Sequence, residues 1–264
     1  MLCLVDKPLI QYGVEEAVAA GCTEIIIITG RGKSTMEDHF DASPELEANL
    51  AAKHKQALLD IVHSVNNLAR VTYTRQPEPL GLGHAILMAK ELVNDQPFAI
   101  LLPDDIVDST VPCMKQLVEA FNETQCSIIG SEVIEGPAIS SYGVLDCTPV
   151  PHNPRLFDIT NMVEKPRFED APSNHAIIGR YILTPRIFDM LEHLTPGAGG
   201  ELQLTDAIKA LLAYDKLYGF SYDGTLASEV ATEVQRCRLM LVTAESCSGG
   251  WIAKTLTDLP GSSA

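Results

Sequence analysis

One stretch, 75–108, constrains the fold more than the rest of the chain, because it holds a loop, a helix, a strand and an acidic turn in direct succession. The helical part begins near His84, and a wholly apolar run follows from Phe98 to Leu102. Asp104 and Asp105 come directly after this run and Pro103, where we expect a turn. In an open parallel sheet, ligands gather at the carboxyl ends of the strands, so the carboxylate pair is well placed to bind a cation.

The loop before this helix suits a flat ligand. Gly81 and Gly83 allow the backbone to come close to it, and the free N–H groups at the helix start can hold an anion or a base edge. Gln76 carries a donor and an acceptor on one amide and can pair with the edge of a pyrimidine. From these residues alone a plain turn, with Asp104 as a cap of the next element, stays open, because two glycines are weak evidence.

Helices and strands alternate along the chain. Helices are expected at Pro8–Ala20, Pro44–Val65, Pro112–Asn122, Arg186–Leu194 and Leu202–Ala213, and further strands at Glu24–Thr29, Arg70–Thr74, Ser127–Val133 and Leu217–Tyr222. Three shorter β-like runs, Tyr142–Asp146, Ile159–Val163 and Ile177–Leu183, are separated by Pro-rich turns. They indicate a small β excursion from an α/β sheet that closes over a substrate.

Composition and charge limit the classes of partner. The chain has 264 residues, of which 46% are hydrophobic and 20% charged, enough for one large α/β core with or without a small appendage. Its formal net charge is -16. Nucleic-acid backbones and anionic membranes attract clustered Lys and Arg, so we expect neither nucleic acid nor a membrane as a partner.

The cysteines indicate a reducing compartment. They are seven in number, scattered and never spaced C-x-x-C: Cys3, Cys22, Cys113, Cys126, Cys147, Cys237 and Cys247. This pattern is typical of free thiols, not of zinc ligands or disulfides. Since no apolar run reaches membrane-spanning length and Met1–Val5 is too short for a signal peptide, we expect a cytoplasmic protein.

Several short segments, taken in order, carry the motifs of one enzyme family. They are Val5–Tyr12 (V-D-K-P-L-I-Q-Y), Arg75–Ala85, Leu101–Asp105, Ser141–Val144 (S-Y-G-V), Val163–Pro166 (V-E-K-P), Ala171–Tyr181 and Gly199–Ile208 (G-G-E-L-Q-L-T-D-A-I). On these residues the chain resembles bacterial UTP:glucose-1-phosphate uridylyltransferases, sugar nucleotidyltransferases that make UDP-glucose. The resemblance implies a Rossmann-like, mostly parallel sheet of the nucleotidyltransferase type, with UTP and glucose 1-phosphate or UDP-glucose as ligands.

The resemblance also implies a role for individual residues. Gln76, Gly81 and Gly83 match the loop that holds uracil, and Asp104 matches the metal ligand of the L-P-D turn. The expected cofactor is therefore Mg²⁺. His84 is expected to be a helix-start residue and not a catalytic base, because the phosphate of glucose 1-phosphate is already an anion that attacks the α-phosphorus of UTP.

The sugar end is assigned in the same way. In this family the Glu of V-E-K-P, here Glu164, holds sugar hydroxyls, and its Lys, here Lys165, holds a phosphate. Without the resemblance the two residues read as an ordinary surface ion pair. Gly143, Asn174 and Gly179 complete the sugar-binding set, with Asp104 and Lys165 as the residues expected to carry catalysis.

Two departures from the family lower the expected activity. The family begins with a strand and a phosphate loop, G-x-G-T-R-x-L-P-x-T-K-x-x-P-K-E, and this chain starts just beyond them, so we expect the first strand of the sheet to be missing. Glu24–Thr29 and Phe98–Leu102 are then expected to have unpaired edges or a gap. Gly219–Thr225 resembles the strand before the second metal-binding Asp, but Leu226 follows. We expect weak UDP-glucose binding and synthesis near background.

The C-terminal part has a different character. Thr243–Ala264 resembles the opening of the nicotinamide-nucleotide amidohydrolase domain found at the C-terminus of competence-damage proteins. Ser246, or alternatively Ser248, would be the nucleophile, but the Lys and Tyr that serve it in that family come later than Ala264. We therefore expect two units, a nucleotidyltransferase-like domain at 1–226 and an amidohydrolase-like fragment at 227–264 without amidase activity.

Two hypotheses of different classes follow. The first is an enzyme that forms UDP-glucose and pyrophosphate, and the second is a non-catalytic remnant that binds a nucleotide or a partner protein. Amide hydrolysis by the tail is a weaker third. Because unpaired strand edges favour self-association, a homo-oligomer is also expected.

Overall fold

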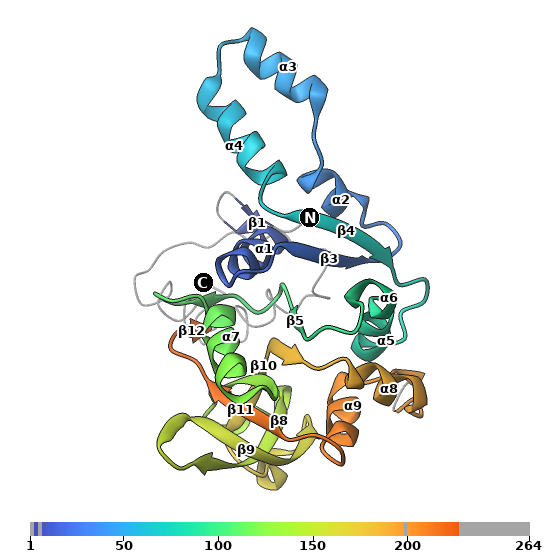
Figure 1. Cartoon of the computed structure of the whole chain (residues 1–264), viewed down its shortest axis with the longest axis vertical. Coiled ribbons are helices and arrows are strands. Elements are labelled where there is room, and N and C mark those ends of the chain that lie inside the picture. Colours follow the sequence, from blue (N-terminus) through green and yellow to red (C-terminus); the bar gives the residue numbers. More distant parts are fainter. Residues whose placement is uncertain (1–2, 5–6, 198–199, 227–264) are drawn as a thin grey trace, which may run out of the picture.

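The computed structural model describes residues 3–4, 7–197 and 200–226. The main sheet has six strands in the order β5-β10-β7-β11-β9-β8. Their bounds are β5 (Phe98–Leu101), β7 (Ser127–Val133), β8 (Gly143–Val150), β9 (Asn153–Glu164), β10 (His175–Leu183) and β11 (Leu217–Ser221). A second sheet pairs β3 (Glu24–Thr29) with β4 (Arg70–Arg75), and Figure 1 shows it above β5.

The α/β class is confirmed, but the expectation of a mostly parallel sheet is wrong for the described strands. Only β3 with β4 and β7 with β11 run parallel among these pairs. The other contacts of the main sheet are antiparallel. The reason is that the β excursion does not leave the sheet: β8 and β9 join through a tight turn and extend it, and β10 returns between β5 and β7.

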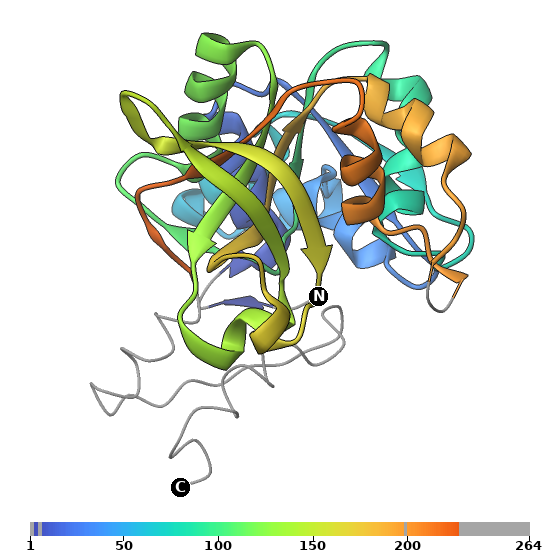
Figure 2. The ribbon, with the colours of Figure 1, turned by 90° about the horizontal axis from the view of Figure 1, so that it is seen from below.

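Helices cover both faces of the main sheet. Ile128 packs toward α7 (Cys113–Thr124), and its neighbour Ile129 packs in the cluster that contains α8 (Arg186–His193) and α9 (Leu204–Leu211). This alternation follows from the two-residue period of a strand. Figure 2 shows α7 on one side of the strands and α8 with α9 on the other.

Two strands have an open edge in the described part of the chain. β3 pairs only with β4, and β5 pairs only with β10. The predicted unpaired edges of these two apolar strands are therefore confirmed. None of the four residues of β5 is fully buried, although the strand is apolar throughout.

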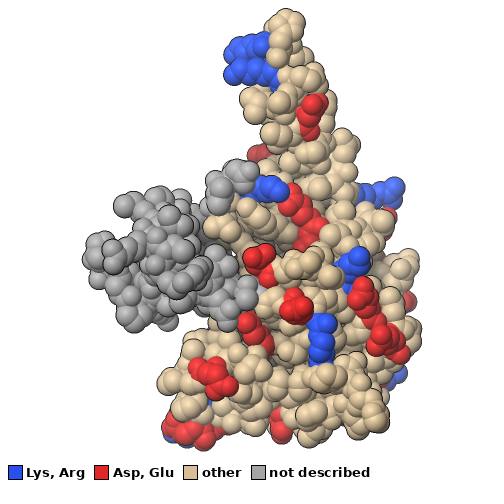
Figure 3. All heavy atoms as spheres, turned by 90° about the vertical axis from the view of Figure 1, so that its left-hand side faces the viewer, with Lys and Arg blue, Asp and Glu red and all other residues tan. Residues whose placement is uncertain are grey.

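The predicted single helix over Pro44–Val65 is wrong, because the segment forms two helices, α3 (Pro44–Ala52) and α4 (Gln56–Asn66). The chain turns at His54, which adopts a left-handed backbone conformation with φ 54°. Neither helix has a fully buried residue. The pair projects from the body in Figure 1, and Figure 3 shows Lys and Arg side chains at its outer end.

The other elements are short or connect these units. They are β1 (Cys3–Leu4), β2 (Lys7–Pro8), α1 (Leu9–Ala19), α2 (Ser34–Phe40), α5 (Leu82–Leu87), α6 (Lys90–Val93), β6 (Val107–Asp108), β12 (Thr225–Leu226) and two 3₁₀ helices at Gly136–Ser141 and Phe168–Asp170. No helix in the described ranges is long and apolar enough to span a membrane.

Candidate functional site

A cavity of about 260 Å³ opens beside the acidic turn that follows β5. Asp104 lines it, together with Gly143 at the start of β8 and Glu164 and Lys165 at the end of β9. These segments meet because Gly143 pairs with Glu164 in the β8–β9 register, and β10 joins β8 to β5. The structure thus brings together four residues that the sequence analysis assigned to three separate motifs.

The two carboxylates of the turn have different environments. Asp105 accepts a hydrogen bond from the backbone N–H of Gly179 at 2.7 Å. Burial raises the pKa of the Asp105 carboxyl, and the neighbouring Asp104 raises it further, while the bond from Gly179 and the charge of Arg180 oppose this shift. Asp105 therefore anchors the turn, and Asp104 is the carboxylate left to face a ligand.

Gly179 supports the turn and does not line this cavity. A Cβ atom at this position would lie 2.5 Å from Cβ of Leu102 and 2.7 Å from Oδ2 of Asp105. Only glycine allows β10 to approach the turn so closely. Asn174, just before β10, donates from Nδ2 to Glu135 at 3.0 Å and also lies outside the cavity lining. Sugar contacts by these two residues stay predictions.

Glu164 is held by a residue that the sequence analysis did not assign. Thr205 donates from its hydroxyl to Oε2 of Glu164 at 2.7 Å, and both residues line the cavity. The signal was present in the sequence, because Thr205 belongs to the G-E-L-Q-L-T-D segment. Gly143 leaves room for the same carboxylate, since a Cβ there would lie 3.2 Å from Oε2.

Lys165 has an unusual backbone conformation. Its φ is 43°, in the left-handed region, and its N–H donates to the carbonyl of Tyr142 at 3.1 Å. A non-glycine residue in this region costs on the order of 1 kcal/mol and needs support from its surroundings. Its Nζ lies 4.0 Å from Oε1 of Glu164, and 64% of the side chain is exposed, so the ion pair contributes little to stability. The ammonium is free to meet an anion.

The glycine loop packs against the chain itself. A Cβ at Gly81 or Gly83 would lie 2.8 or 2.7 Å from the carbonyl oxygen of Leu202. Gly83 N–H donates to that oxygen, and Leu202 N–H donates to Leu80, each at 2.8 Å. The two glycines are therefore required by this backbone contact, which sequence reasoning missed because the partners are about 120 residues apart. Leu82, between them, lines the cavity.

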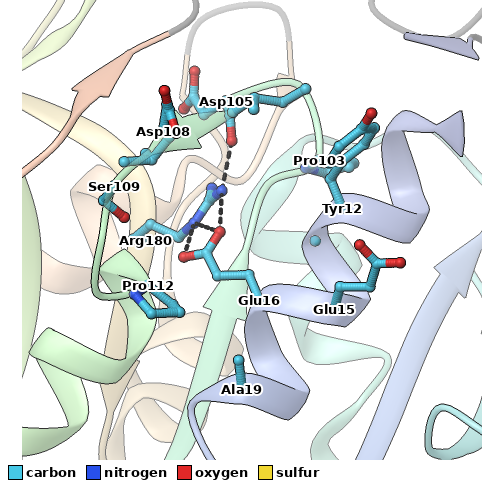
Figure 4. Close-up of a pocket in the computed structure, with 13 residues that line it drawn as sticks. Tyr12, Glu15, Glu16, Ala19, Pro103, Asp105, Asp108, Ser109, Pro112 and Arg180 are labelled. Atoms are coloured by element: carbon cyan, nitrogen blue, oxygen red, sulfur yellow. Dashed lines mark hydrogen bonds and ion pairs between the residues drawn. The ribbon is translucent and has the colours of Figure 1, made fainter. Parts of the chain in front are cut away.

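A second cavity, also about 260 Å³, lies behind the acidic turn and contains the buried ion pair of Arg180 with Glu16. Figure 4 shows Arg180 between Glu16 of α1 and the turn. Its guanidinium donates to both carboxylate oxygens of Glu16, to the carbonyl of Leu102 at 3.0 Å and to that of Asp105 at 2.6 Å. These bonds hold the backbone on both sides of Asp104.

The donor set fits a hard divalent cation that is only partly held by protein. Asp104 and Glu164 supply carboxylate oxygens to the first cavity. Within the described ranges no group of three or more His, Cys, Asp or Glu side chains forms a metal cage. A cation bound through one or two carboxylates, with water and phosphate oxygens as its other ligands, is the usual arrangement for Mg²⁺.

Comparison with known proteins agrees with this arrangement. The model of the nucleotidyl transferase family matches residues 1–227. UTP–glucose-1-phosphate uridylyltransferase of Bacillus subtilis is 48% identical over 224 residues, which cover 85% of this chain and 76% of the relative. The chain belongs to the nucleotidyl transferase family, among the UTP–glucose-1-phosphate uridylyltransferases. A second such enzyme, from Staphylococcus saprophyticus, is 49% identical over 85% of this chain and 77% of its own length.

Solved structures of UTP–glucose-1-phosphate uridylyltransferases under their other name, UDP-glucose pyrophosphorylases, have the same fold. One, complexed with UDP-glucose, is 39% identical, with a TM-score of 0.75 over 84% of this chain and 81% of its own. An apo form is 38% identical, with a TM-score of 0.80 over 89% of each chain. The predicted resemblance and fold type are confirmed.

A second family model, the CinA C-terminal domain, matches residues 223–264 of this nucleotidyl transferase. This agrees with the resemblance to competence-damage proteins. The predicted tail nucleophile Ser246 lies outside the described residues, as does nearly all of this segment.

Proposed function

We propose that this chain is a nucleotidyltransferase that forms UDP-glucose and pyrophosphate from UTP and glucose 1-phosphate, with the cavity beside Asp104 as its active site. The observation that carries the proposal is the meeting of Asp104, Glu164 and Lys165 at one cavity of about 260 Å³. Support also comes from relatives near 48% identity with that name and from similar structures complexed with UDP-glucose or UTP.

The reaction is an in-line displacement. A phosphate oxygen of glucose 1-phosphate forms a bond to the α-phosphorus of UTP, the bond from this phosphorus to the bridging oxygen breaks, and pyrophosphate leaves with the electron pair. The nucleophile is already an anion, so no protein base is needed. The protein must orient two anions and offset their repulsion.

Asp104 would hold Mg²⁺, which neutralises the developing charge on the phosphates when it is bound. Lys165 would supply a mobile cation to the phosphate that joins uridine and glucose, because its side chain is largely exposed. Glu164 would accept hydrogen bonds from glucose hydroxyls, oriented by Thr205. Removing one preorganised donor of this kind typically lowers the rate about a hundredfold to a thousandfold.

The nucleotide would extend from the cavity along the loop that contains Leu82. Gln76, Gly81 and Gly83 would hold the uracil, with Gly143 at the glucose and Asn174 and Gly179 as further residues of the sugar end. Leu82 supports this direction, because it lines the cavity from within the loop.

Turnover separates the proposal from non-catalytic binding. Against the near-background synthesis expected from the two departures in sequence, the proposal predicts measurable UDP-glucose from UTP and glucose 1-phosphate with Mg²⁺, detected by coupled release of pyrophosphate. It also predicts a loss of at least about a hundredfold in Asp104→Ala. Asp189→Ala, in the first turn of α8 and outside the cavity lining, is the control. Binding of UDP-glucose without any product would instead support the remnant hypothesis. Product formed equally by Asp104→Ala would refute the role of the turn.

We further propose a division at about residue 226, because the two family models meet at 223–227. The second unit is amidohydrolase-like, and we expect no amide hydrolysis by residues 227–264 themselves. Nicotinamide mononucleotide hydrolysis that disappears in Ser246→Ala would contradict this.

A cytoplasmic location and self-association complete the proposal. Cys22, Cys113, Cys126 and Cys147 are free thiols, as expected in a reducing compartment. Ile61 on α4 is 58% exposed, and β3 and β5 have open edges among the described strands, so we expect a homo-oligomer. A monomer at all concentrations in sedimentation experiments would contradict the oligomer.

A further inference from the structure

His84 contacts the residue proposed to read the base. It lies in the first turn of α5, and its Nδ1 is 3.0 Å from Nε2 of Gln76. The same Nε2 is 3.1 Å from the carbonyl oxygen of Gly81. Both side chains are half-buried, so each contact fixes an orientation in the loop.

The carbonyl of Gly81 decides which atom of each side chain donates. A carbonyl oxygen only accepts, so the group of Gln76 that faces it must be the NH₂ group. This nitrogen has two hydrogens, one for Gly81 and one for His84. His84 Nδ1 therefore accepts, and the proton of a neutral imidazole lies on its Nε2.

One atom of the Gln76 amide is left for a ligand. Its Oε1 accepts no hydrogen bond from the described residues. It is also not one of the buried side-chain polar atoms that lack a hydrogen-bond partner in that part of the chain. A carbonyl oxygen can only accept, so the base edge that meets it must donate. Uracil carries a donor at N3, whereas cytosine carries an acceptor there.

We propose that His84 is a positioning residue that sets the site's preference for uracil over cytosine, by holding the Gln76 amide with Oε1 toward the base. The inference rests on the proposed function. Gly81 binds only one of the two amide hydrogens. Without an acceptor at position 84, a single hydrogen bond to Gly81 holds the amide, so it turns more easily and presents its NH₂ group, which suits N3 of cytosine.

The test compares the affinities of UDP-glucose and CDP-glucose by calorimetry in the 264-residue protein, His84→Ala and His84→Asn. Asparagine places its Oδ1 acceptor near the position of Nδ1 and serves as the matched rescue variant. We expect the wild type to bind UDP-glucose more tightly than CDP-glucose. The ratio of the two affinities should fall about tenfold in His84→Ala and stay unchanged in His84→Asn. Thermal melts check that all three proteins are folded.

Several results would overturn the inference. An unchanged preference in His84→Ala would do so, as would an equal fall in both affinities, because a merely structural role predicts that fall. An equal loss of preference in His84→Asn would also contradict it. Equal binding of both ligands by the wild type refutes the inference alone, whereas no binding of UDP-glucose by the wild type refutes it together with the proposed function.

Discussion

Replacing Glu16 by alanine should leave Arg180 buried without its counter-charge. Only 2% of the Arg180 side chain and 12% of the Glu16 side chain are exposed, and the two charged groups approach to 2.8 Å. Burial alone would lower the pKa of Arg180, but the hydrogen bond and charge of Glu16 outweigh this and raise it. The guanidinium stays charged in the variant, with three backbone carbonyls as its remaining partners.

The expected cost is large. Removing one partner of a buried ion pair typically destabilises a protein by about 3–5 kcal/mol, because the other charge is left uncompensated. For a domain of this size the melting temperature should fall by about 6–20 °C. Glu16 also accepts the backbone N–H of Met114 at 2.9 Å, so the start of α7 loses a bond as well.

Denaturant unfolding monitored by circular dichroism measures this loss. Glu15→Ala is the matched control, because Glu15 is the next residue of α1 but its contacts with Lys7 and Gln11 are part-exposed. The control should change the free energy of unfolding by less than about 1 kcal/mol. A loss below about 1 kcal/mol in Glu16→Ala would refute the view that this ion pair holds the acidic turn.

Three further predictions concern single contacts. Gly179→Ala should destabilise the chain by about 1–3 kcal/mol in urea unfolding, since a Cβ there meets a side-chain carbon at 2.5 Å, whereas Gly13→Ala, with nothing within 4 Å, should not. Thr205→Val should weaken UDP-glucose binding about tenfold and Thr205→Ser should not, because the hydroxyl orients Glu164; equal affinities would refute this. Burial, followed by nearby carboxylates, raises the pKa of Tyr73 to about 12, above that of the unfolded chain, so its stabilising contribution should be present below about pH 10 and lost as pH rises through about 12. Tyr73→Phe should flatten this pH dependence of unfolding, and an unchanged profile would contradict the assignment.

The parts of the site that follow directly after a strand could be predicted from the sequence. An apolar run followed by two aspartates locates β5 and the acidic turn, and V-E-K-P places Glu164 and Lys165 at the end of β9. Their meeting at one cavity follows from the sheet. Local patterns locate these residues along the chain, and the antiparallel pairings of β10 with β5 and β8, and of β8 with β9, bring them together.

Contacts between distant residues could not be predicted. Glu16 and Arg180 are 164 positions apart, and nothing in either local sequence indicates a buried pair. Strand direction likewise depends on which strands meet, so the expectation of a mostly parallel sheet failed where β10 entered that sheet between β5 and β7. The break at His54 was missed because no Gly or Pro marks it.

Calorimetric titration of UDP-glucose into the 264-residue protein tests the central claim most directly, because binding requires the cavity but not turnover. The account predicts saturable binding that Gln76→Ala and Glu164→Ala each weaken about tenfold or more, acting at opposite ends of the ligand. Arg70→Ala, whose ion pair with Glu24 is exposed, should leave the affinity unchanged. No binding by the wild type, or binding that both Gln76→Ala and Glu164→Ala leave intact, would contradict the account.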